Sequence, residues 1–389
     1  MACESVFHAM RLLLVTHFYP SHGGGIELVA EQLARRLIGA GHRVVWCASD
    51  VDPPPAIAGV EARPMRSFNL VERISGFPYP LWSASAWRTL AREVRDCDAV
   101  HVHDAIYAGS LVASVLARRA RRRLVVTQHI ATVPLPRPLR PVFALANRLA
   151  AATVLARADA VAFISPEVQR HFEGLVGARD GFAYVPNGVD TALFHPPTVD
   201  RDALKAELGF DPRRPLLLFV GRFVPKKRLP LVRALAAQRP HWQWCVVGKG
   251  PEDPAAWGLA NVAVPGPLPP QRLAQLYRAA DLLVLPSVGE GFPLVVQEAM
   301  ACGLLPCIRA EVAAGADLPG HLWVPLPPDG LHADAERDAA ERAIADALAR
   351  PPRHRADRGR AVAAHAASHW CWEAAARWHA DRLAGERAT

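Results

Sequence analysis

This sequence has no Cys-x-x-Cys pair, no long apolar run and no evident secretory signal, and each of these leads us to expect one class of protein less. The 389 residues include seven cysteines but no Cys-x-x-Cys pair, so neither a disulfide framework nor a structural zinc site is indicated. Cys47, Cys245 and Cys307 lie within apolar runs, as buried thiols do in a reducing compartment. No apolar run reaches the roughly 18 residues of a membrane-spanning helix, and no basic segment followed by an apolar one begins the chain. We therefore expect a cytoplasmic protein, for which Met10, directly before the first predicted strand, is an alternative start.

Lysine is also scarce, and acidic residues are missing from one long stretch. Only four lysines occur, and Lys226, Lys227 and Lys249 all follow predicted strands in the second half of the chain. The formal net charge is +8, and positions 105–158 contain no Asp or Glu but hold nine arginines: Arg118, Arg119, Arg121, Arg122, Arg123, Arg137, Arg140, Arg148 and Arg157. An anionic membrane surface or an acidic lipid-linked substrate fits this stretch better than nucleic acid, because no nucleic-acid-binding motif accompanies it. A solvated, arginine-rich surface is the alternative that the composition leaves open.

Apolar strands alternate with helices along the chain. A helix is predicted at 26–40, and continuous apolar runs predict strands at 11–16, 43–48, 99–103, 124–127, 160–164, 216–220, 244–247, 262–264, 282–285 and 305–308. This alternation predicts an α/β fold of two Rossmann-like, doubly wound domains, residues 1–195 and 196–367, with a C-terminal helix in residues 368–389. Ligands of such sheets bind beyond the carboxyl ends of the strands, so we expect the site in a cleft between the domains.

Two glutamates near the end of one predicted strand carry the clearest functional signal. Glu290 follows the strand at 282–285 in a glycine-rich turn, and Glu298 lies about one turn into the next helix, with Pro293 expected at its first position. Roughly 9 Å of helix axis separates Phe292 from Glu298, which is too far for an acid–base pair acting on one atom. The spacing suits an elongated ligand with hydroxyls at both ends and an anion near the helix N-terminus, as in a nucleotide sugar.

The run from Gly289 to Gly303, with its Glu, seven residues, Glu spacing, resembles the nucleotide-sugar motif of retaining glycosyltransferase family 4. The resemblance implies the GT-B fold, in which two Rossmann-like domains face each other across a cleft and the last helix crosses back to the first domain. It implies transfer of a sugar, with retention, from a nucleoside diphosphate sugar to a hydroxyl of an acceptor glycan or lipid-linked sugar. Cell-surface polysaccharide or glycolipid synthesis is the expected setting, with neither a cofactor nor a metal.

Roles for individual residues follow from the same resemblance. Arg222 and Lys227 match the cations that hold the donor diphosphate, where negative charge builds up as the glycosidic bond breaks. Glu290 is expected to hold donor-sugar hydroxyls, Glu298 the ribose, and His129 the reacting face of the sugar. The other residues expected to contact the donor are Gly24, Gly25, Asn187, Gly291, Phe292, Pro293 and Leu294.

Other motifs admit a second interpretation. The glycines at 23–25 fail as a dinucleotide fingerprint because Leu28 stands where Gly or Ala is required, which disfavours a dinucleotide-dependent oxidoreductase or epimerase. Asp50 and Asp52 resemble a metal-binding pair, yet they lie in a proline-rich loop, and we interpret them as a coincidence of that loop. His101 and His103 end one strand and are expected to point the same way, either toward the acceptor or, with a third ligand, toward a metal.

The sequence also departs from the family in two places. Arg228 follows the second cation where Gly is common, and residues 306–312 replace the usual Pro-Val-Val and Gly-Gly-x-x-Glu pattern. A non-catalytic scaffold that kept the fold, and a soluble glycosyltransferase acting on a small molecule, are the remaining alternatives.

Overall fold

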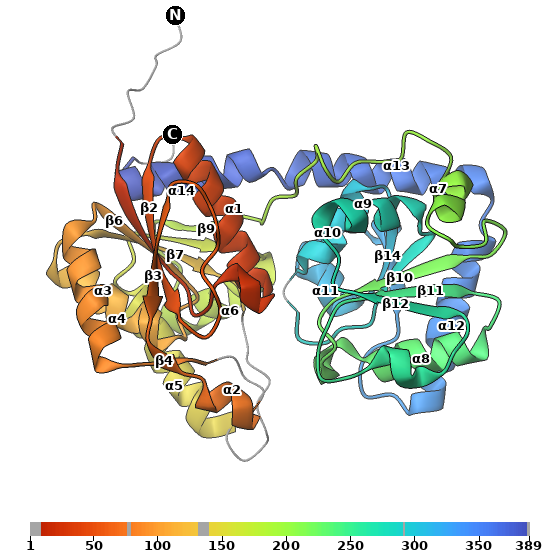
Figure 1. Ribbon diagram of the computed structural model, residues 1–389, viewed down its shortest axis with the longest axis horizontal. Helices are drawn as coiled ribbons and strands as arrows, with labels where there is room; N and C mark the ends of the chain where they lie inside the picture. Colours follow the sequence, from red (N-terminus) through yellow and green to blue (C-terminus); the bar gives the residue numbers. More distant parts are fainter. Residues whose placement is uncertain (1–8, 76–78, 131–139, 291, 387–389) are drawn as a thin grey trace, which may run out of the picture. The chain divides into compact units, whose positions relative to one another are not determined.

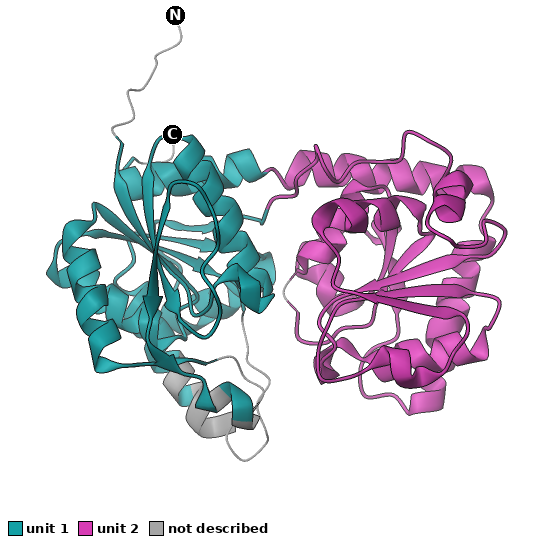
Figure 2. Cartoon of the chain, in the orientation of Figure 1, with its two compact units in different colours: residues 1–187, 372–389 teal, residues 188–371 magenta. Residues whose placement is uncertain are grey.

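The computed structural model describes residues 9–75, 79–130, 140–290 and 292–386, and the chain divides into two units. Unit 1 comprises residues 1–187 and 372–389, and unit 2 comprises residues 188–371 (Figure 2). The chain therefore leaves unit 1 after Asn187 and returns to it at Trp372. The domain limits expected from the sequence remain predictions.

Unit 1 is built on a sheet of seven parallel strands in the order β3-β2-β1-β6-β7-β8-β9. Its strands are β1 (Arg11–Val15), β2 (Arg43–Ser49), β3 (Val60–Met65), β6 (Ala99–His103), β7 (Arg123–Gln128), β8 (Ala160–Phe163) and β9 (Phe182–Tyr184). The five strands expected in this half are confirmed. The edge strands β3 and β9 were missed because their side chains are largely half-buried or exposed, so neither has a continuous apolar run.

Helices cover both faces of this sheet (Figure 1). Alternate residues of β1 point to opposite sides, so that Leu13 packs in one core with helices α3 to α6, and Leu12 in a second core with α1 and α14. The helices are α1 (Gly25–Gly39), α2 (Leu70–Ser75), α3 (Ala84–Asp96), α4 (Ala108–Arg119), α5 (Arg140–Leu155), α6 (Pro166–Val176) and α14 (Trp372–Ala384), with a 3₁₀ turn η1 (Pro20–His22). The short strands β4 (Ser67–Phe68) and β5 (Leu81–Trp82) form a separate antiparallel pair.

Unit 2 repeats the design with six parallel strands in the order β12-β11-β10-β13-β14-β15. The strands are β10 (Leu216–Val220), β11 (Gln243–Val247), β12 (Val262–Gly266), β13 (Leu282–Leu285), β14 (Leu305–Arg309) and β15 (Val324–Leu326). All five strands expected here are confirmed, and only the three-residue β15 was missed. In Figure 1, α9, α10 and α13 lie on one side of the sheet, and α8 and α12 on the other.

The helices of unit 2 are α7 (Arg201–Glu207), α8 (Leu229–Gln238), α9 (Pro270–Ala279), α10 (Leu294–Ala301), α11 (Ala310–Ala314), α12 (Ala333–Ala349) and α13 (Pro352–His369), with 3₁₀ turns η3 (Pro225–Lys227), η4 (Pro254–Trp257) and η5 (Gly320–Leu322). Pro293 is the N-cap of α10, with ψ 135°, so the expectation that it is the first helical residue is wrong by one position. None of the helices in the described part of the chain combines the length and apolar content needed to span a membrane.

Both sheets have the Rossmann strand order, in which the direction of winding reverses once. The reversal lies between β1 and β6 in unit 1 and between β10 and β13 in unit 2. In open α/β sheets this switch point, at the carboxyl ends of the strands, is where ligands bind. The residues that follow β1, β6, β10 and β13 are therefore the first place to look for a site.

Candidate functional site

At the switch point of unit 2, one carboxylate lies against two ammonium groups. Glu290, in the loop after β13, places Oε1 3.0 Å from Lys227 Nζ and 3.2 Å from Lys226 Nζ, both from the η3 turn. Lys227 is buried, and a Cβ added to Gly221 would lie 3.3 Å from its Cε, so the lysine stem lies along the end of β10. The structure thus brings together two residues to which the sequence gave separate roles.

Burial and charge act in opposite directions on this pair. Burial lowers the pKa of the Lys227 ammonium, and Glu290 only partly restores it. Burial by itself would raise the pKa of the Glu290 carboxyl, but Lys227 and Lys226 together bring it below its ordinary value. The half-buried Arg222 adds positive charge near Lys227, and within the described residues no hydrogen bond or ion pair holds its side chain. The loop therefore carries more positive than negative charge, as a diphosphate site requires.

Glu298 lies on α10 and has a different partner. The Tyr277 hydroxyl, from α9, donates to Glu298 Oε2 at 3.0 Å. Burial raises the pKa of the Glu298 carboxyl to about 7, although the bond from Tyr277 acts in the opposite direction. Phe292 is buried with its ring 5.1 Å from that of Trp370, and Leu294 is the first residue of α10. Gly291 lies outside the described residues.

At the switch point of unit 1, buried histidines take the place of charged pairs. His129 follows β7, and its Nε2 lies 2.9 Å from Nδ1 of His103 at the end of β6. His101 Nε2 lies 2.8 Å from Thr127 Oγ1, which lies 2.9 Å from Nε2 of His379 on α14. His101 and His103 point the same way, as predicted, with ring centroids 4.5 Å apart. All four rings are at most 4% exposed, so neither His101 nor His103 presents its ring at an open surface.

These histidines are held in the neutral form. Burial lowers the pKa of His129 to about 3 and that of His379 to about 4, and places those of His101 and His103 well below the ordinary value. The imidazoles therefore supply hydrogen bonds and shape rather than positive charge at neutral pH.

Asp104 is a candidate residue that the sequence interpretation missed. It directly follows β6, has a left-handed backbone with φ 60°, and is fully buried. Its Oδ1 accepts hydrogen bonds from the backbone N–H of His129 at 2.8 Å and from Gln128 Nε2 at 2.7 Å, and Oδ2 has no hydrogen-bond partner among the described residues. Burial raises the pKa of this carboxyl to about 7. A strained, buried acid at the end of a central strand is typical of a functional site, and its place next to His103 was the available signal.

The glycines before α1 leave room for a buried contact between Glu27 and His17. Gly24 is the N-cap of α1 and Gly25 its first residue. A Cβ on Gly24 would lie 2.1 Å from Glu27 Oε2, and Glu27 Oε1 lies 2.9 Å from His17 Nε2. The ring of His17 stacks on Tyr107 at 3.9 Å. A side chain at position 24 would therefore displace the Glu27 carboxylate from its place beside His17.

The remaining residues expected at the site are placed as follows. Asn187 is buried at the end of unit 1. Asp50 Oδ1 accepts from the backbone N–H and hydroxyl of Ser67 at 2.9 and 3.0 Å, and Asp52 Oδ2 lies 2.7 Å from His22 Nδ1. In the part of the chain that the structure describes, no group of three or more His, Cys, Asp or Glu side chains is arranged to hold a metal ion.

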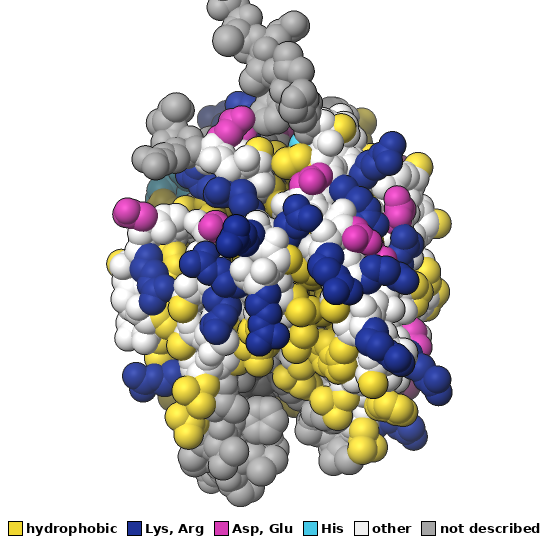
Figure 3. Space-filling view, turned by 90° about the vertical axis from the view of Figure 1, so that its left-hand side faces the viewer, with side chains coloured by type: hydrophobic (Ala, Val, Ile, Leu, Met, Phe, Trp, Pro, Cys, Tyr) yellow, Lys and Arg dark blue, Asp and Glu magenta, His cyan; other side chains and the backbone are white. Residues whose placement is uncertain are grey.

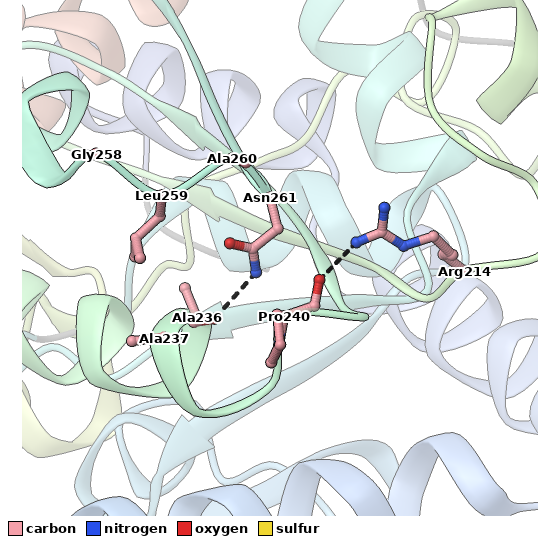
Figure 4. A pocket seen from close by; sticks show the side chains of 8 residues that line it. All are labelled: Arg214, Ala236, Ala237, Pro240, Gly258, Leu259, Ala260 and Asn261. Atoms are coloured by element: carbon pink, nitrogen blue, oxygen red, sulfur yellow. Dashed lines mark hydrogen bonds between the residues drawn. The ribbon is translucent and has the colours of Figure 1, made fainter.

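A pocket of about 270 Å³ elsewhere in unit 2 is not part of this site (Figure 4). It is lined by residues that precede β10 and β12 or end α8, so it lies at the amino ends of the strands. Asn261 Nδ2 donates to the Ala236 carbonyl at 3.0 Å, and Arg214 Nη2 to the Pro240 carbonyl at 2.7 Å. These polar groups bind the backbone and leave little for a ligand.

Comparison with known proteins places a chain of this fold in a family of glycosyltransferases. The model of Glycosyltransferase Family 4 matches residues 23–193, and that of Glycosyl transferases group 1 matches residues 200–362. The D-inositol 3-phosphate glycosyltransferase of Acidothermus cellulolyticus is 30% identical over 333 residues, covering 74% of this chain and 71% of that protein. The chain belongs to glycosyltransferase family 4.

Other similar proteins match with different extents. The D-inositol 3-phosphate glycosyltransferase of Segniliparus rotundus is 40% identical over 215 residues, which cover 49% of this chain and 44% of that protein. The match thus spans less than half the length of that relative. The crystal structure of Anabaena HepE (Alr3699) in complex with UDP and glucose has a TM-score of 0.74 at 19% identity, covering 96% of this chain and 99% of HepE. This likeness confirms the expected GT-B fold.

Proposed function

We propose that this protein is a retaining glycosyltransferase that moves one sugar from a nucleoside diphosphate sugar to an acceptor hydroxyl. The observation that carries the proposal is the cluster of Arg222, Lys226, Lys227 and Glu290 at the switch point of unit 2, with Glu298 on α10. During transfer the bond between the anomeric carbon and the phosphate oxygen breaks, and the bond to the acceptor oxygen forms on the same face. The acceptor proton passes to the departing phosphate.

In this reaction the Lys227–Glu290 ion pair is exchanged for contacts between each of the two side chains and the donor. Without a donor, Glu290 balances the two lysines. When the diphosphate binds, the ammonium groups and Arg222 turn to the phosphate oxygens, and the Glu290 carboxylate is released to accept hydrogen bonds from the sugar hydroxyls. The cations then stabilise the charge that builds up on the leaving diphosphate, where preorganised donors have their largest effect.

In unit 1 we propose that Asp104 and His103 position His129 beside the transferred sugar. Asp104 holds the backbone of His129, and His103 holds its ring. A neutral imidazole suits this role, because positive charge develops at the anomeric carbon and a second cation there would oppose it. The reaction needs neither a cofactor nor a bound metal, because fixed cations meet the charge of the diphosphate.

Donor and acceptor follow from the named relatives only as proposals. HepE binds UDP and glucose, and two relatives are named for an inositol 3-phosphate acceptor. We propose a hexose as the transferred sugar and a phosphate-bearing acceptor, which the arginine-rich stretch of unit 1 would favour. A soluble enzyme acting on a small phosphorylated molecule, and an enzyme acting on a lipid-linked sugar, both remain compatible with this chemistry.

A thermal-shift screen followed by a transfer assay tests the proposal. Nucleoside diphosphates and their glucose and mannose conjugates are added first, and the stabilising donor is then incubated with inositol phosphate or a lipid-linked acceptor. We expect one base to stabilise the protein and the sugar to be transferred with the α-configuration retained. A protein that binds no nucleoside diphosphate and turns over no donor would be a scaffold rather than an enzyme.

We also propose that unit 1 binds the cytoplasmic surface of an anionic membrane. Leu145 and Leu149 on α5 are 59% and 60% exposed, one turn apart, and Arg148 between them is exposed. Figure 3 shows Lys and Arg side chains spread over this side of the molecule, with some Asp and Glu side chains among them, and apolar side chains gathered in its lower part. An interfacial anchor combines these two features.

Two arginines of the basic stretch form hydrogen bonds within unit 1. Arg122 Nη2 donates to the Arg95 carbonyl at 2.6 Å and Arg123 Nε to the Arg382 carbonyl at 3.0 Å, so these two guanidinium groups bind the protein itself. The segment 134–139, which mixes proline, leucine and arginine, lies outside the described residues.

Sedimentation with vesicles tests the membrane proposal. We expect binding to phosphatidylserine vesicles at low salt, release at high salt, and weaker binding of the Leu145→Ser, Leu149→Ser double variant. The matched control is Leu331→Ser, an exposed leucine of unit 2 that is 43% exposed. Binding that is equal on neutral and anionic vesicles, or absent on both, would contradict this part of the proposal.

A further inference from the structure

A buried arginine occupies the place where the sequence departs from its family. Arg309, the last residue of β14, has a fully buried side chain. Its Nε donates to the Pro286 carbonyl, just after β13, at 3.0 Å, and its Nη1 donates to the Pro327 carbonyl, just after β15. Its Nη2 donates to Glu336 Oε1 at 2.5 Å, in the first turn of α12. One guanidinium therefore ties together the ends of three neighbouring strands and a helix.

The other oxygen of this carboxylate reaches the loop that carries Lys227. Glu336 Oε2 accepts from Arg228 Nη2 at 2.5 Å, and Arg228 also lies 3.4 Å from Asp329. Arg228 has φ 57° and ψ 39°, a left-handed conformation that favours glycine. The ion pairs thus hold an arginine in a strained backbone, at the residue next to Lys227.

The same network touches the loop that carries Glu290. Pro286, bonded to Arg309, begins that loop, and the Val288 N–H donates to the Lys226 carbonyl at 2.9 Å. Both members of the Lys227–Glu290 pair are therefore attached, within a few residues, to the Arg309–Glu336 pair. The Lys227–Glu290 distance of 3.0 Å depends on these two loops keeping their relative position.

We propose that Arg309 and Glu336 are positioning residues for the donor site, acting through Arg228 and the Pro286 carbonyl to hold Lys227 against Glu290. The effect of this positioning on catalysis rests on the proposed function. The geometric part concerns only the two loops of unit 2. A displacement of about 1 Å in a reacting group costs roughly a hundredfold in rate, so loosening the loops should be measurable.

Unit 2 contains a matched control for this network. Glu341, also on α12 and also buried, forms an ion pair with Arg239 at the end of α8. The Glu336–Arg228 and Glu341–Arg239 pairs thus join α12 to opposite ends of the same helix, and only the first adjoins the candidate site. Glu336→Gln and Glu341→Gln remove comparable charges from the same element.

Hydrogen exchange of the full chain tests the geometry without any assay of activity. In Glu336→Gln we expect the amides of Lys227, Arg228 and Val288 to exchange faster than in the parent, while Glu341→Gln leaves them unchanged. Arg228→Gly serves as a second variant in case Glu336→Gln proves unstable. Glycine accepts the left-handed backbone, so this variant removes the ion pair with Glu336 while the fold is preserved. Equal exchange in Glu336→Gln and the parent, or the same increase in Glu341→Gln, would overturn the positioning role.

Binding of UDP and GDP, measured by calorimetry, gives the second readout. We expect Glu336→Gln and Arg228→Gly to weaken binding of the preferred diphosphate and to lower kcat/KM roughly tenfold to a hundredfold, and Glu341→Gln to change neither. Unchanged affinity in both site-side variants would overturn the role in the donor site. If the parent protein binds neither these two nor any other nucleoside diphosphate of the thermal-shift screen, the proposed function fails, and the exchange experiment alone decides whether the network holds the two loops.

Discussion

The two units share the Rossmann strand order and place their candidate residues at the same topological point, yet the two sets of residues differ in charge. In unit 1 the ends of β6 and β7 hold neutral histidines beside a buried acid, Asp104. In unit 2 the Lys227–Glu290 cluster, in the loops after β10 and β13, holds three cations with one carboxylate, Glu290, between two of them. The sheet supplies the position, and the side chains supply the chemistry.

The difference matches the two ends of the proposed donor. In the proposed function, the fixed cations of unit 2 meet the negative charge of the nucleoside diphosphate. The transferred sugar is neutral and develops positive charge as its bond to phosphate breaks, so a site with buried, uncharged imidazoles suits it. Each unit therefore has its own pH dependence, and its own response to mutation, as the following predictions specify.

Acid should destabilise unit 1 far more than unit 2. In the folded protein the pKa values of His129 and His379 are about 3 and about 4, and those of His101 and His103 are well below 6.5. From pH 6.5 down to about 4, the unfolded chain therefore binds more protons than the folded one. Asp104 opposes this, since its folded pKa of about 7 lies above the ordinary 3.8. On unfolding, the four histidines take up about four protons and Asp104 releases about one. The free energy of unfolding should therefore fall by about 4 kcal/mol for each pH unit of acidification in that window.

Hydrogen exchange at about pH 7 and pH 5, corrected for intrinsic rates, measures this effect separately in peptides of each unit. In the variant His379→Gln, the pH dependence of the stability of unit 1 should correspond to about one proton fewer. The variant His241→Gln, at an exposed position, should leave this pH dependence unchanged. Loss of protection in unit 2 before unit 1 would contradict the comparison.

Lys227→Ala should abolish most transfer while both units stay folded. Loss of one preorganised charge contact costs roughly 2.7–4 kcal/mol, or about a hundredfold to a thousandfold in kcat. Steady-state kinetics with the preferred donor measures the effect, and Arg233→Ala, an exposed cation on α8, is the matched control. Near-parental turnover in Lys227→Ala would remove this residue from the site.

Glu298 should make donor binding depend on pH near neutrality. Its carboxyl has a folded pKa of about 7, raised by burial, and only the ionised form accepts two hydrogen bonds from a ribose. Donor affinity should therefore rise up to about tenfold between pH 6 and 8, and Glu298→Gln should remove most of this dependence. Because the folded pKa is raised, this group's contribution to the stability of the ligand-free protein falls as pH rises from about 4.5 to about 7.

Calorimetric titration of the nucleoside diphosphate at several pH values measures the dependence. A steep rise that persists in Glu298→Gln would assign it to another group, such as Asp104 in unit 1.

A chelator should have the smallest effect. Arg222, Lys226 and Lys227 already supply positive charge at the proposed diphosphate site, so EDTA is expected to leave the transfer rate unchanged. The assay compares initial rates before and after dialysis against EDTA. Complete loss of activity that magnesium or manganese restores would return attention to Asp50 and Asp52, whose oxygens now bind Ser67 and His22.

Much of the fold was predictable because both sheets are covered on each side. Central strands such as 282–285 are continuous apolar runs, and such runs are recognisable without knowing their neighbours. The edge strands β3, β9 and β15 were not, because they are short or partly exposed and depend on a neighbouring strand for their hydrogen bonds. Lys227, Glu290, Glu298 and His129 could be nominated from motifs, whereas the Lys227–Glu290 pairing, Tyr277 and Asp104 could not.

The sequence by itself determined the α/β class, the alternation that builds two sheets, and the spacing that puts Glu290 in a loop and Glu298 on a helix, because local periodicity and turn residues decide these features. Only the tertiary structure decided that Lys227 pairs with Glu290, that Tyr277 meets Glu298, that Asp104 holds His129, and that Arg309 and Glu336 reach Arg228. The physical reason is that the members of these pairs lie 20 to more than 100 residues apart in the chain, so only the packing of strands and helices in the folded unit brings them within hydrogen-bond distance.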